Sequence, residues 1–488
     1  MPMHWWVLRR QLHVSWLIAI FCGAIIIGIF TVQSFQIVLF GSFAYLFIGL
    51  TFSAVGMWGR YLYLIPLVIV GGLIVGVWRG SVHSNEFADT KSLMGYSVTI
   101  SGKVTEDVDS STDGQLALRL NDLVIMGRTL KGSLWVTISD SSADIKRRDR
   151  VTIFGKVGGG FGSFAGSIYQ AKLVKVVRPT PGDWALRLRD WFSSGVRLAI
   201  ADPAASLGIG YLVGQKRALP TDLIEALKIA GLTHIVVASG YNLTILVRLT
   251  RRLFEKISKY LAALSAAAMI FGFVSITGLS PSMTRAALVA SLSLAAWYYG
   301  RKFHPLVLLP IAAAITVLVN PSYLWGDLGW QLSFAAFAGV MILAPLLQRY
   351  FFGEAKPGVV RQILGETISA TLLTAPILIT AFGQISNVSL IANLLVLPFV
   401  PLAMLLTFMA GIGAIIVPSL AIIVGWPATM LLNYMIWVAN ELSKLSWATT
   451  TWQVSGLVEA ICYGLIIGLC LYLWRTTHYN LAEANIVE

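Results

Sequence analysis

The side chains most able to do chemistry interrupt an apolar run near the middle of the chain, residues 231–247. Ser239, Gly240, Tyr241 and Asn242 place hydroxyl and amide groups, and a helix-weakening glycine, in a stretch apolar enough for a bilayer. Within lipid, broken helices persist only where they are buried in protein or line a wet cavity. The run predicts a pathway inside a membrane protein, with these four residues as candidates to line it or contact its substrate.

A second polar group combines a tight Gly/Pro turn with Ser282 and Arg285. Arg285 lies just inside the following apolar span. Its side chain either snorkels to the membrane interface or faces the bundle interior as a fixed positive charge. An inward guanidinium would bind a phosphate or a structural carboxylate, because its fork stays charged and offers paired donors. Both residues are candidates to line the path.

A third group surrounds Asp327, at the start of another apolar span. Asp327 either caps that helix or pairs with Arg285 and holds the walls of a pore in register. Gln331 and Ser333 lie one turn deeper, where polar side chains can line a path.

The fourth group contains Asn393, followed by Pro398 and Pro401. The two prolines predict a kinked or discontinuous helix. An asparagine in an apolar helix either makes an interhelical hydrogen bond or contacts the substrate, and both interpretations stay open.

The composition indicates a membrane protein. Of 488 residues, 57% are hydrophobic and only 12% are charged, whereas a soluble chain carries about 25% charged residues. The three cysteines (Cys22, Cys462, Cys470) lie in apolar segments without metal-ligand spacing, and we interpret them as small hydrophobic residues.

Apolar segments of about 20 residues predict about twelve transmembrane helices. Three lie within an N-terminal membrane region, 1–80. The others belong to a channel domain, 205–475, which a short cytoplasmic tail follows at 476–488. The expected spans are 14–30, 35–55, 61–78, 233–247, 261–277, 283–299, 304–320, 329–347, 363–382, 388–415, 418–440 and 455–474.

Region 86–178 differs, because hydrophobic and polar residues alternate there in short runs separated by glycine turns. This pattern predicts a small all-β barrel or sandwich of about five strands. An amphipathic helix at 183–200 follows and suits a membrane surface. With the N-terminus inside, the β domain lies outside and the basic loops lie inside, as the positive-inside rule requires. The net charge of +13 is thereby explained by topology and is poor evidence for DNA binding.

Basic residues of the β domain form two clusters that could hold a nucleic acid backbone. The aromatic residues Trp135, Phe154, Phe161, Phe164 and Tyr169 are possible stacking platforms, although part of them is expected in the barrel core. The domain therefore either contacts DNA or has a structural role against the membrane block. The DNA-contact candidates are Lys146, Arg147, Arg148, Arg150, Lys172 and Lys175.

No hydrolytic or nucleotide-binding motif is present in the sequence. The six histidines are scattered, and no phosphate-binding loop ending in Gly-Lys-Ser/Thr exists. We expect no enzymatic activity, no cofactor and no metal site.

These groups, in this order, resemble the ComEC family of competence channels, which pass single-stranded DNA across the bacterial inner membrane. The resemblance rests on 212–220, 230–240, 281–286, 300–301, 327–334 and 387–401. It implies a polytopic α-helical fold with an inserted OB-like extracytoplasmic domain and a plasma (inner) membrane location. The implied partners are single-stranded DNA, membrane lipids, a DNA receptor or pilus machinery, and a cytosolic helicase-like motor.

Two departures from the family pattern matter. The family usually reads Ser-Gly-Leu-His where this chain has Ser239-Gly240-Tyr241-Asn242, so a role for that histidine does not carry over. Many members also end in a metallo-β-lactamase-like domain, whereas only 14 residues follow Trp474. We expect any nuclease activity to come from a separate protein.

The sequence thus favours an inner-membrane channel that conducts single-stranded DNA inward during natural transformation. One alternative is a transporter of a small anion or lipid-linked precursor on the same scaffold, for which an acidic residue in mid-membrane would be expected. Another is a non-transporting envelope assembly protein, which would have a closed, dry bundle.

Overall fold

The computed structural model describes residues 11–35, 42–87, 90, 92–110, 115–139, 144–180, 182–215, 219–236, 240–278, 281–300, 304–355, 357–452 and 455–479. The chain divides into two compact units. The first unit contains Met1–Arg178 and Phe303–Phe334, and the second contains Pro179–Lys302 and Ala335–Glu488. The segment 303–334, placed by the sequence in the channel domain, therefore packs with the N-terminal part of the chain.

The N-terminal helices of the first unit pack through glycines. Helix α4 (Ile65–Glu86) contacts both α2 (Val14–Phe35) and α3 (Phe43–Gly59), and the short η1 (Leu62–Leu64) precedes it. A side chain on Gly28 of α2 would lie 3.1 Å from the Cα of Gly76 in α4. Small residues let helix backbones approach closely, which favours packing where the hydrophobic effect between helices is weak.

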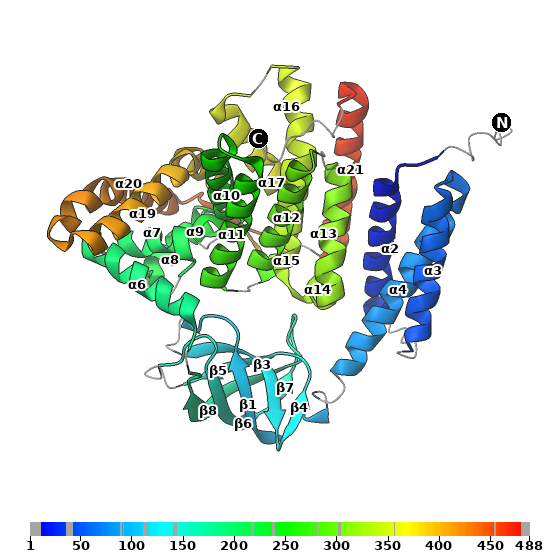
Figure 1. The fold of residues 1–488 in the computed structure, drawn as a ribbon, viewed down its shortest axis with the longest axis horizontal. Helices are drawn as coiled ribbons and strands as arrows, with labels where there is room; N and C mark the ends of the chain where they lie inside the picture. The colour runs from blue at the N-terminus through cyan, green and yellow to red at the C-terminus, as the bar shows by residue number, and fades with distance from the viewer. Residues whose placement is uncertain are drawn as a thin grey trace. The chain divides into compact units, whose positions relative to one another are not determined.

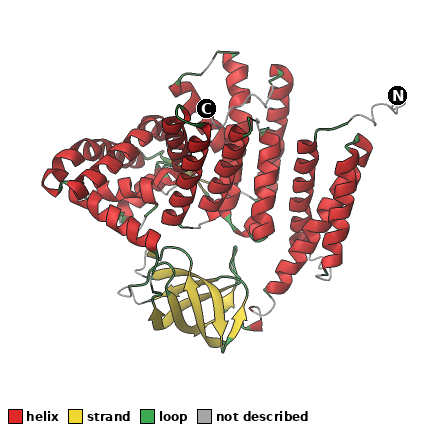
Figure 2. Cartoon of the chain, viewed as in Figure 1, coloured by secondary structure: helices red, strands yellow, loops and turns green. Residues whose placement is uncertain are grey.

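The β region forms a closed barrel, coloured yellow in Figure 2. Its strand order is β1-β6-β8-β5-β3-β2, and an additional β1–β3 pairing closes the sheet, while β4 pairs with β3 and β7 with β8. The strands are β1 (Ser97–Val104), β2 (Asp109–Ser110), β3 (Leu116–Ile125), β4 (Arg128–Leu130), β5 (Leu134–Ile138), β6 (Arg150–Lys156), β7 (Gly158–Gly159) and β8 (Gly166–Val177). Neighbouring strands are antiparallel except β5 and β8, which run parallel.

The barrel core is aliphatic. Inward positions of the strands supply Ile, Leu and Val side chains such as Ile100, Leu118 and Ile153. The expectation that part of the barrel's aromatic residues fill this core was wrong. Trp135, Phe161 and Phe164 instead pack on one another with ring centroids 5.4–6.0 Å apart.

Within the first unit, two contacts connect the segment 303–334 to the rest: one joins it to α4 and the other joins it to the barrel. Arg79 of α4 donates to the carbonyls of Leu318 (2.7 Å) and Val319 (3.0 Å), the last residues of α13 (Pro305–Val319). These carbonyls have no partner within the helix because they lie in its final turn. The second contact is between two glycines, Gly162 of the barrel and Gly326. The backbones lie so close that a side chain on Gly162 would lie 2.7 Å from the Gly326 carbonyl oxygen. Gly326 ends α14 (Tyr323–Gly326), and α15 (Leu328–Ala338) follows.

The described part of the second unit is helical (Figure 1), apart from one two-stranded antiparallel sheet. Its first helices are α6 (Trp184–Ala199), α7 (Ala204–Val213), α8 (Thr221–Ile229), α9 (Thr233–Val236), α10 (Gly240–Glu255), α11 (Lys259–Thr277) and α12 (Pro281–Tyr298). The later ones are η2 (Gly339–Leu343), α16 (Ala344–Phe352), α17 (Val359–Phe382), α18 (Ser389–Val396), η3 (Leu397–Phe399), α19 (Val400–Ile416), η4 (Pro418–Leu420), α20 (Ala421–Ser443) and α21 (Gly456–Thr477). This sheet pairs β9 (Gln384–Ser386) with β10 (Thr449–Thr451).

Helix α6 coincides with the predicted amphipathic helix. Its inner face packs on α19, where Phe192 stacks with Phe408 at 6.0 Å. Trp184, Leu188 and Trp191 are exposed and share one face of the helix, as expected for a helix at a membrane surface.

Eight helices among the described residues are long and apolar enough to cross a membrane, so the chain is a multi-pass membrane protein. They are Val14–Phe35, Leu62–Glu86, Lys259–Thr277, Leu328–Phe352, Val359–Phe382, Ser389–Ile416, Pro418–Ser443 and Gly456–Thr477. The predicted count of about twelve is not confirmed.

Four predicted spans are not among the eight. Those at 35–55 and 304–320 correspond to α3 and α13, which are shorter apolar helices. The span at 283–299 corresponds to α12, whose first turns carry Ser282, Thr284 and Arg285. The described part of 233–247 belongs to α9 and to α10, and α10 is amphipathic rather than uniformly apolar.

Candidate functional site

The interrupted run begins with a break that the structure places at Gly231. Helix α8 ends at Ile229, and Gly231 then adopts a φ of 72°, a conformation that glycine reaches without steric cost. A side chain at Gly231 would also crowd the backbone of Ser389, at 3.3 Å from its Cα. The hydroxyl of Ser386 donates to the Ile229 carbonyl at 2.6 Å, next to the same break.

The four predicted residues of this run have different surroundings. Ser239 lies outside the described residues. Gly240 begins α10, and a side chain there would meet the Cβ of Ala286 in α12 at 3.2 Å. Tyr241 is exposed. Asn242 is fully buried, and its Nδ2 donates to the Tyr211 carbonyl of α7 at 3.0 Å.

Arg285 faces the interior of the second unit, since only 2% of it is exposed. This position agrees with the inward alternative and excludes the snorkelling one. Ser282, one turn earlier in α12, is exposed. A guanidinium inside a helical membrane protein is costly and typically marks an ion or substrate pathway.

Asp327 caps α15. Its Oδ1 accepts a hydrogen bond from the Trp330 backbone nitrogen at 2.6 Å, which is the geometry of an N-cap. Asp327 belongs to the first unit and Arg285 to the second, so their pairing stays a prediction. Gln331 donates to the Leu324 carbonyl at 3.0 Å, and Ser333 is half-buried.

Asn393 lies in a discontinuous helix, as the two prolines predicted. The 3-10 turn η3 separates α18 from α19, and it contains Pro398. Asn393 is buried, and its Oδ1 accepts no hydrogen bond within the part of the chain that the structure describes. Buried amide oxygens are seldom left without a donor, so this acceptor is available to a water or a substrate group.

A carboxylate in the membrane block was missed by the sequence reasoning. Glu366 lies half-buried in α17 and accepts a hydrogen bond from Gln362 at 2.9 Å. The signal was available, because Glu366 is an acidic residue within an apolar segment that was predicted to span the membrane.

The basic end of α10 is organised by an aromatic side chain. The guanidinium of Arg251 lies over the Trp297 ring at 5.0 Å, and the Lys259 ammonium lies over the same ring at 5.7 Å. The quadrupole of the indole ring attracts both cations. The positive-inside rule predicts that this basic segment lies on the cytoplasmic side.

The two-stranded sheet of β9 and β10 brings two distant polar segments of the second unit together. The Nδ2 of Asn387 donates to the Trp447 carbonyl at 2.8 Å and to the Thr450 hydroxyl at 2.7 Å. The partners of Asn387 lie 60 and 63 residues further along the chain, so no local pattern in the sequence indicates them.

The basic cluster formed by Lys146, Arg147, Arg148 and Arg150 of the barrel is partly turned inward. Arg147 is buried, and Lys146 is half-buried. The adjacent Asp149 is only 1% exposed and binds the Arg178 guanidinium at 3.0 Å. The hydrogen bonds to Asp149 raise the pKa of Arg178, so the charge of Arg178 is paired within the domain. Of the four basic residues in this cluster, Arg148 and Arg150 are exposed.

The outer face of β6 and β8 combines exposed cations with exposed rings. Lys172 lies opposite Phe154 in the paired strands, and Lys175 lies opposite Thr152. Phe154 is 45% exposed and Tyr169 is 62% exposed. Cations beside exposed aromatic rings are the arrangement that holds single-stranded nucleic acid in small barrels.

Comparisons with known proteins agree on one family. The family model described as "Competence: Competence protein" matches residues 211–477. The protein "ComE operon protein 3" of Bacillus subtilis (strain 168) is 27% identical over 221 residues, which are 43% of this chain and 27% of that relative. The matched region thus spans about a quarter of the relative's length. No solved structure matches the chain. Because the family model covers more than half of the residues, the chain belongs to the Competence protein family.

Proposed function

We propose that this protein is an inner-membrane channel that passes single-stranded DNA into the cytoplasm during natural transformation. The observation that carries the proposal is the buried Arg285 within the block matched by the Competence family model. A DNA strand presents a phosphate at each nucleotide, and a guanidinium away from bulk water binds phosphate strongly through paired donors.

The route would use the polar groups of the second unit. Tyr241 and Ser282 are exposed on α10 and α12, whereas Arg285 lies deeper in α12. Asn393 would offer its Oδ1 to a base amino group. The basic end of α10 would receive the strand on the cytoplasmic side, where positive charges are favoured.

The barrel would hold the strand before entry. Its closed five-strand core arrangement fits an OB-like domain, a fold that binds single strands along basic, aromatic surfaces. The exposed face of β6 and β8, with Phe154, Tyr169, Lys172 and Lys175, is the part of the barrel that best suits this contact.

Energy and strand processing would come from other proteins. The sequence holds no nucleotide-binding loop, so we propose a cytosolic helicase-like motor that pulls the strand, a receptor or pilus that delivers it, and a separate nuclease. In this scheme the chain itself is a conduit and not an enzyme.

The test is uptake of labelled DNA into a nuclease-protected compartment of the source organism. Wild type, a clean deletion, Arg285→Ala, Arg285→Lys and the exposed control Arg361→Ala are compared at equal protein levels. We expect the deletion and Arg285→Ala to lose uptake by about tenfold or more. Lysine would restore part of it, because it keeps the charge and loses the fork.

Unchanged uptake in the deletion strain, with no second gene copy, would overturn the DNA-channel proposal. Glu366 then becomes informative, because a carboxylate within the membrane block is what a coupled transporter of a small anion would need. Under that rival, Glu366→Gln would abolish transport while DNA uptake stayed at the wild-type level.

A further inference from the structure

The loop between β7 and β8 presents an exposed aromatic ring on a fixed backbone. We call its residues, 160–165, the aromatic loop. Phe161 is 44% exposed, and its carbonyl accepts a hydrogen bond from the Phe164 nitrogen at 3.0 Å. The Ser133 hydroxyl donates to the Ser163 carbonyl at 3.3 Å. Because these bonds already order the loop, Phe161 would lose little conformational freedom when it binds a partner.

Two further aromatic rings support Phe161 from the barrel. The ring centroids of Trp135 and Phe164 lie 6.0 and 5.5 Å from that of Phe161. The Arg119 guanidinium lies over the rings of Trp135 and Phe164, at 5.6 and 5.7 Å. The Glu106 carboxylate binds the same guanidinium at 2.8 Å. The cluster thus exposes an apolar ring beside an ion pair whose charges cancel.

Three apolar helices of the first unit give way to polar residues at one level. The apolar part of α4 ends at Arg79, Asn320 follows α13, and Asp327 precedes α15. The Arg79 guanidinium donates to the last carbonyls of α13. Trp330, in the first turn of α15, donates to Thr316, in the last turn of α13, at 2.9 Å. Since α4 and α15 belong to candidate membrane spans, this level marks a surface of the membrane.

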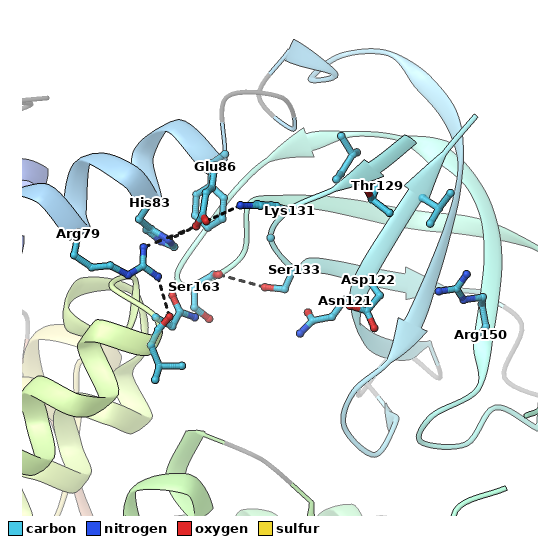
Figure 3. A pocket seen from close by; sticks show the side chains of 16 residues that line it. Arg79, His83, Glu86, Asn121, Asp122, Thr129, Lys131, Ser133, Arg150 and Ser163 are labelled. Atoms are coloured by element: carbon cyan, nitrogen blue, oxygen red, sulfur yellow. Dashed lines mark hydrogen bonds and ion pairs between the residues drawn. The ribbon is translucent and has the colours of Figure 1, made fainter. Parts of the chain in front are cut away.

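The aromatic loop lies at this level. The backbone of Gly162 is so close to Gly326 that a side chain on Gly162 would lie 2.7 Å from the Gly326 carbonyl oxygen. Ser163 lines the same polar pocket as Arg79 of α4 and Val319 of α13 (Figure 3). The loop therefore lies beside the ends of α4 and α13 and close to the start of α15.

We propose that the aromatic loop inserts Phe161 into the headgroup region of the phospholipid bilayer and so anchors the barrel to the membrane surface. Exposed apolar side chains at a fixed position often mark a membrane contact. Aromatic side chains gain free energy at the boundary between headgroups and acyl chains. This anchor holds the barrel at one height beside the start of α15, and it does not depend on the proposed DNA transport.

The geometry of the cluster favours lipid over a DNA strand. Bases stack on open ring faces beside cations that bind the phosphates. Trp135 instead meets Phe161 and Phe164 at interplanar angles of 69° and 64°, so the rings pack edge to face and form no flat platform. The charge of Arg119 is paired with Glu106, and this carboxylate would repel a phosphate.

Fluorescent labels in the full-length protein test the proposal. Phe161→Cys and Phe154→Cys are made in a protein that lacks its three cysteines, and each is labelled with an environment-sensitive nitrobenzoxadiazole group. Phe154 is the matched control, because it is the same residue type, is 45% exposed and lies opposite Lys172 in the paired strands. The proteins are placed in nanodiscs of phosphatidylethanolamine and phosphatidylglycerol, or of phosphatidylcholine alone. We expect spin-labelled lipid to quench the label at 161 in both kinds of nanodisc and to leave the label at 154 unchanged.

A photoreactive side chain provides a second measurement that keeps an aromatic ring in the loop. Benzoylphenylalanine replaces Phe161 or Phe154, and the nanodiscs are irradiated. We expect a phospholipid adduct at 161 and none at 154, detected by mass spectrometry of the protein. This measurement still decides the question if cysteine at 161 disturbs the loop.

Four outcomes would overturn the proposal. An unquenched label at 161 without a lipid adduct would show that the ring faces water. Equal quenching at 161 and 154 would identify non-specific adsorption of the barrel, and quenching only with phosphatidylglycerol would identify adsorption by charge. A lipid adduct prevented by a short oligodeoxynucleotide would identify a strand site. None of these readouts measures DNA uptake, so failure here leaves the proposed channel function standing.

Discussion

Asn242 illustrates how a polar residue in a membrane block can serve the protein's own backbone. It occupies the position where the ComEC pattern has histidine, and its amide reaches a carbonyl in the last turn of α7. The last carbonyls of a helix have no partner within that helix. Asn242 thus supplies the hydrogen bond that the end of α7 lacks, and it joins α7 to α10 inside the second unit.

Asn242→Ala is expected to destabilise the protein by about 1–3 kcal/mol, because it removes a buried hydrogen bond and leaves the Tyr211 carbonyl without this donor. Thermal unfolding in detergent measures the effect. The neighbouring Tyr241→Ala, at an exposed position, is the control and should change the unfolding temperature little. Equal effects of the two substitutions would contradict the assigned role of the amide.

At the scale of elements, glycines determine which parts of the first unit can touch. Gly162 lies in the loop between β7 and β8 with a φ of 59°, and its backbone meets that of Gly326 at the end of α14. A side chain on Gly326 would overlap the Gly162 backbone, which cannot move aside as a flexible side chain can. This contact joins the barrel to the segment that carries Asp327.

Gly326→Ala is therefore expected to weaken the contact between the barrel and the end of α14. Overpacking should lower the free energy of unfolding by about 1–3 kcal/mol. Limited proteolysis of the loop between β7 and β8 in the full-length protein reports the loosening as faster cleavage. Gly464→Ala in α21 is the matched control, because a side chain there has no neighbour within 4 Å. Wild-type cleavage of the Gly326→Ala protein would show that the loop does not depend on this contact.

At the scale of the whole molecule, topology is open to direct test. The sequence predicts an inside N-terminus, an outside barrel and inside basic loops. The test uses Lys175→Cys and Arg252→Cys, two exposed positions, each in a protein that lacks Cys22, Cys462 and Cys470. The two variants should differ in labelling by a maleimide that does not cross the membrane. We expect labelling at 175 in intact cells, and at 252 only after permeabilisation. The reverse pattern would invert the topology and with it the proposed direction of transport.

Local pattern determined much of the architecture. Period-two alternation predicted the barrel, the hydrophobic runs predicted all eight candidate spans, and two prolines predicted the discontinuity between α18 and α19. These features depend on residues close together in sequence, so the local pattern of hydrophobic, polar and proline residues is enough to predict them. The count of twelve was not confirmed, because α3 and α13 are short and α10 and α12 carry polar residues in apolar surroundings.

The tertiary structure decided what depends on residues far apart. Only packing shows that Arg285 is buried, that Asn242 binds Tyr211, that Asp149 holds Arg178, and that 303–334 joins the N-terminal unit. The sequence by itself determined that the chain is a membrane protein with an inserted β domain, because hydrophobicity and alternation are properties of consecutive residues. Which polar side chain serves the backbone and which remains for a ligand depends on partners brought together by folding, and no local pattern contains them.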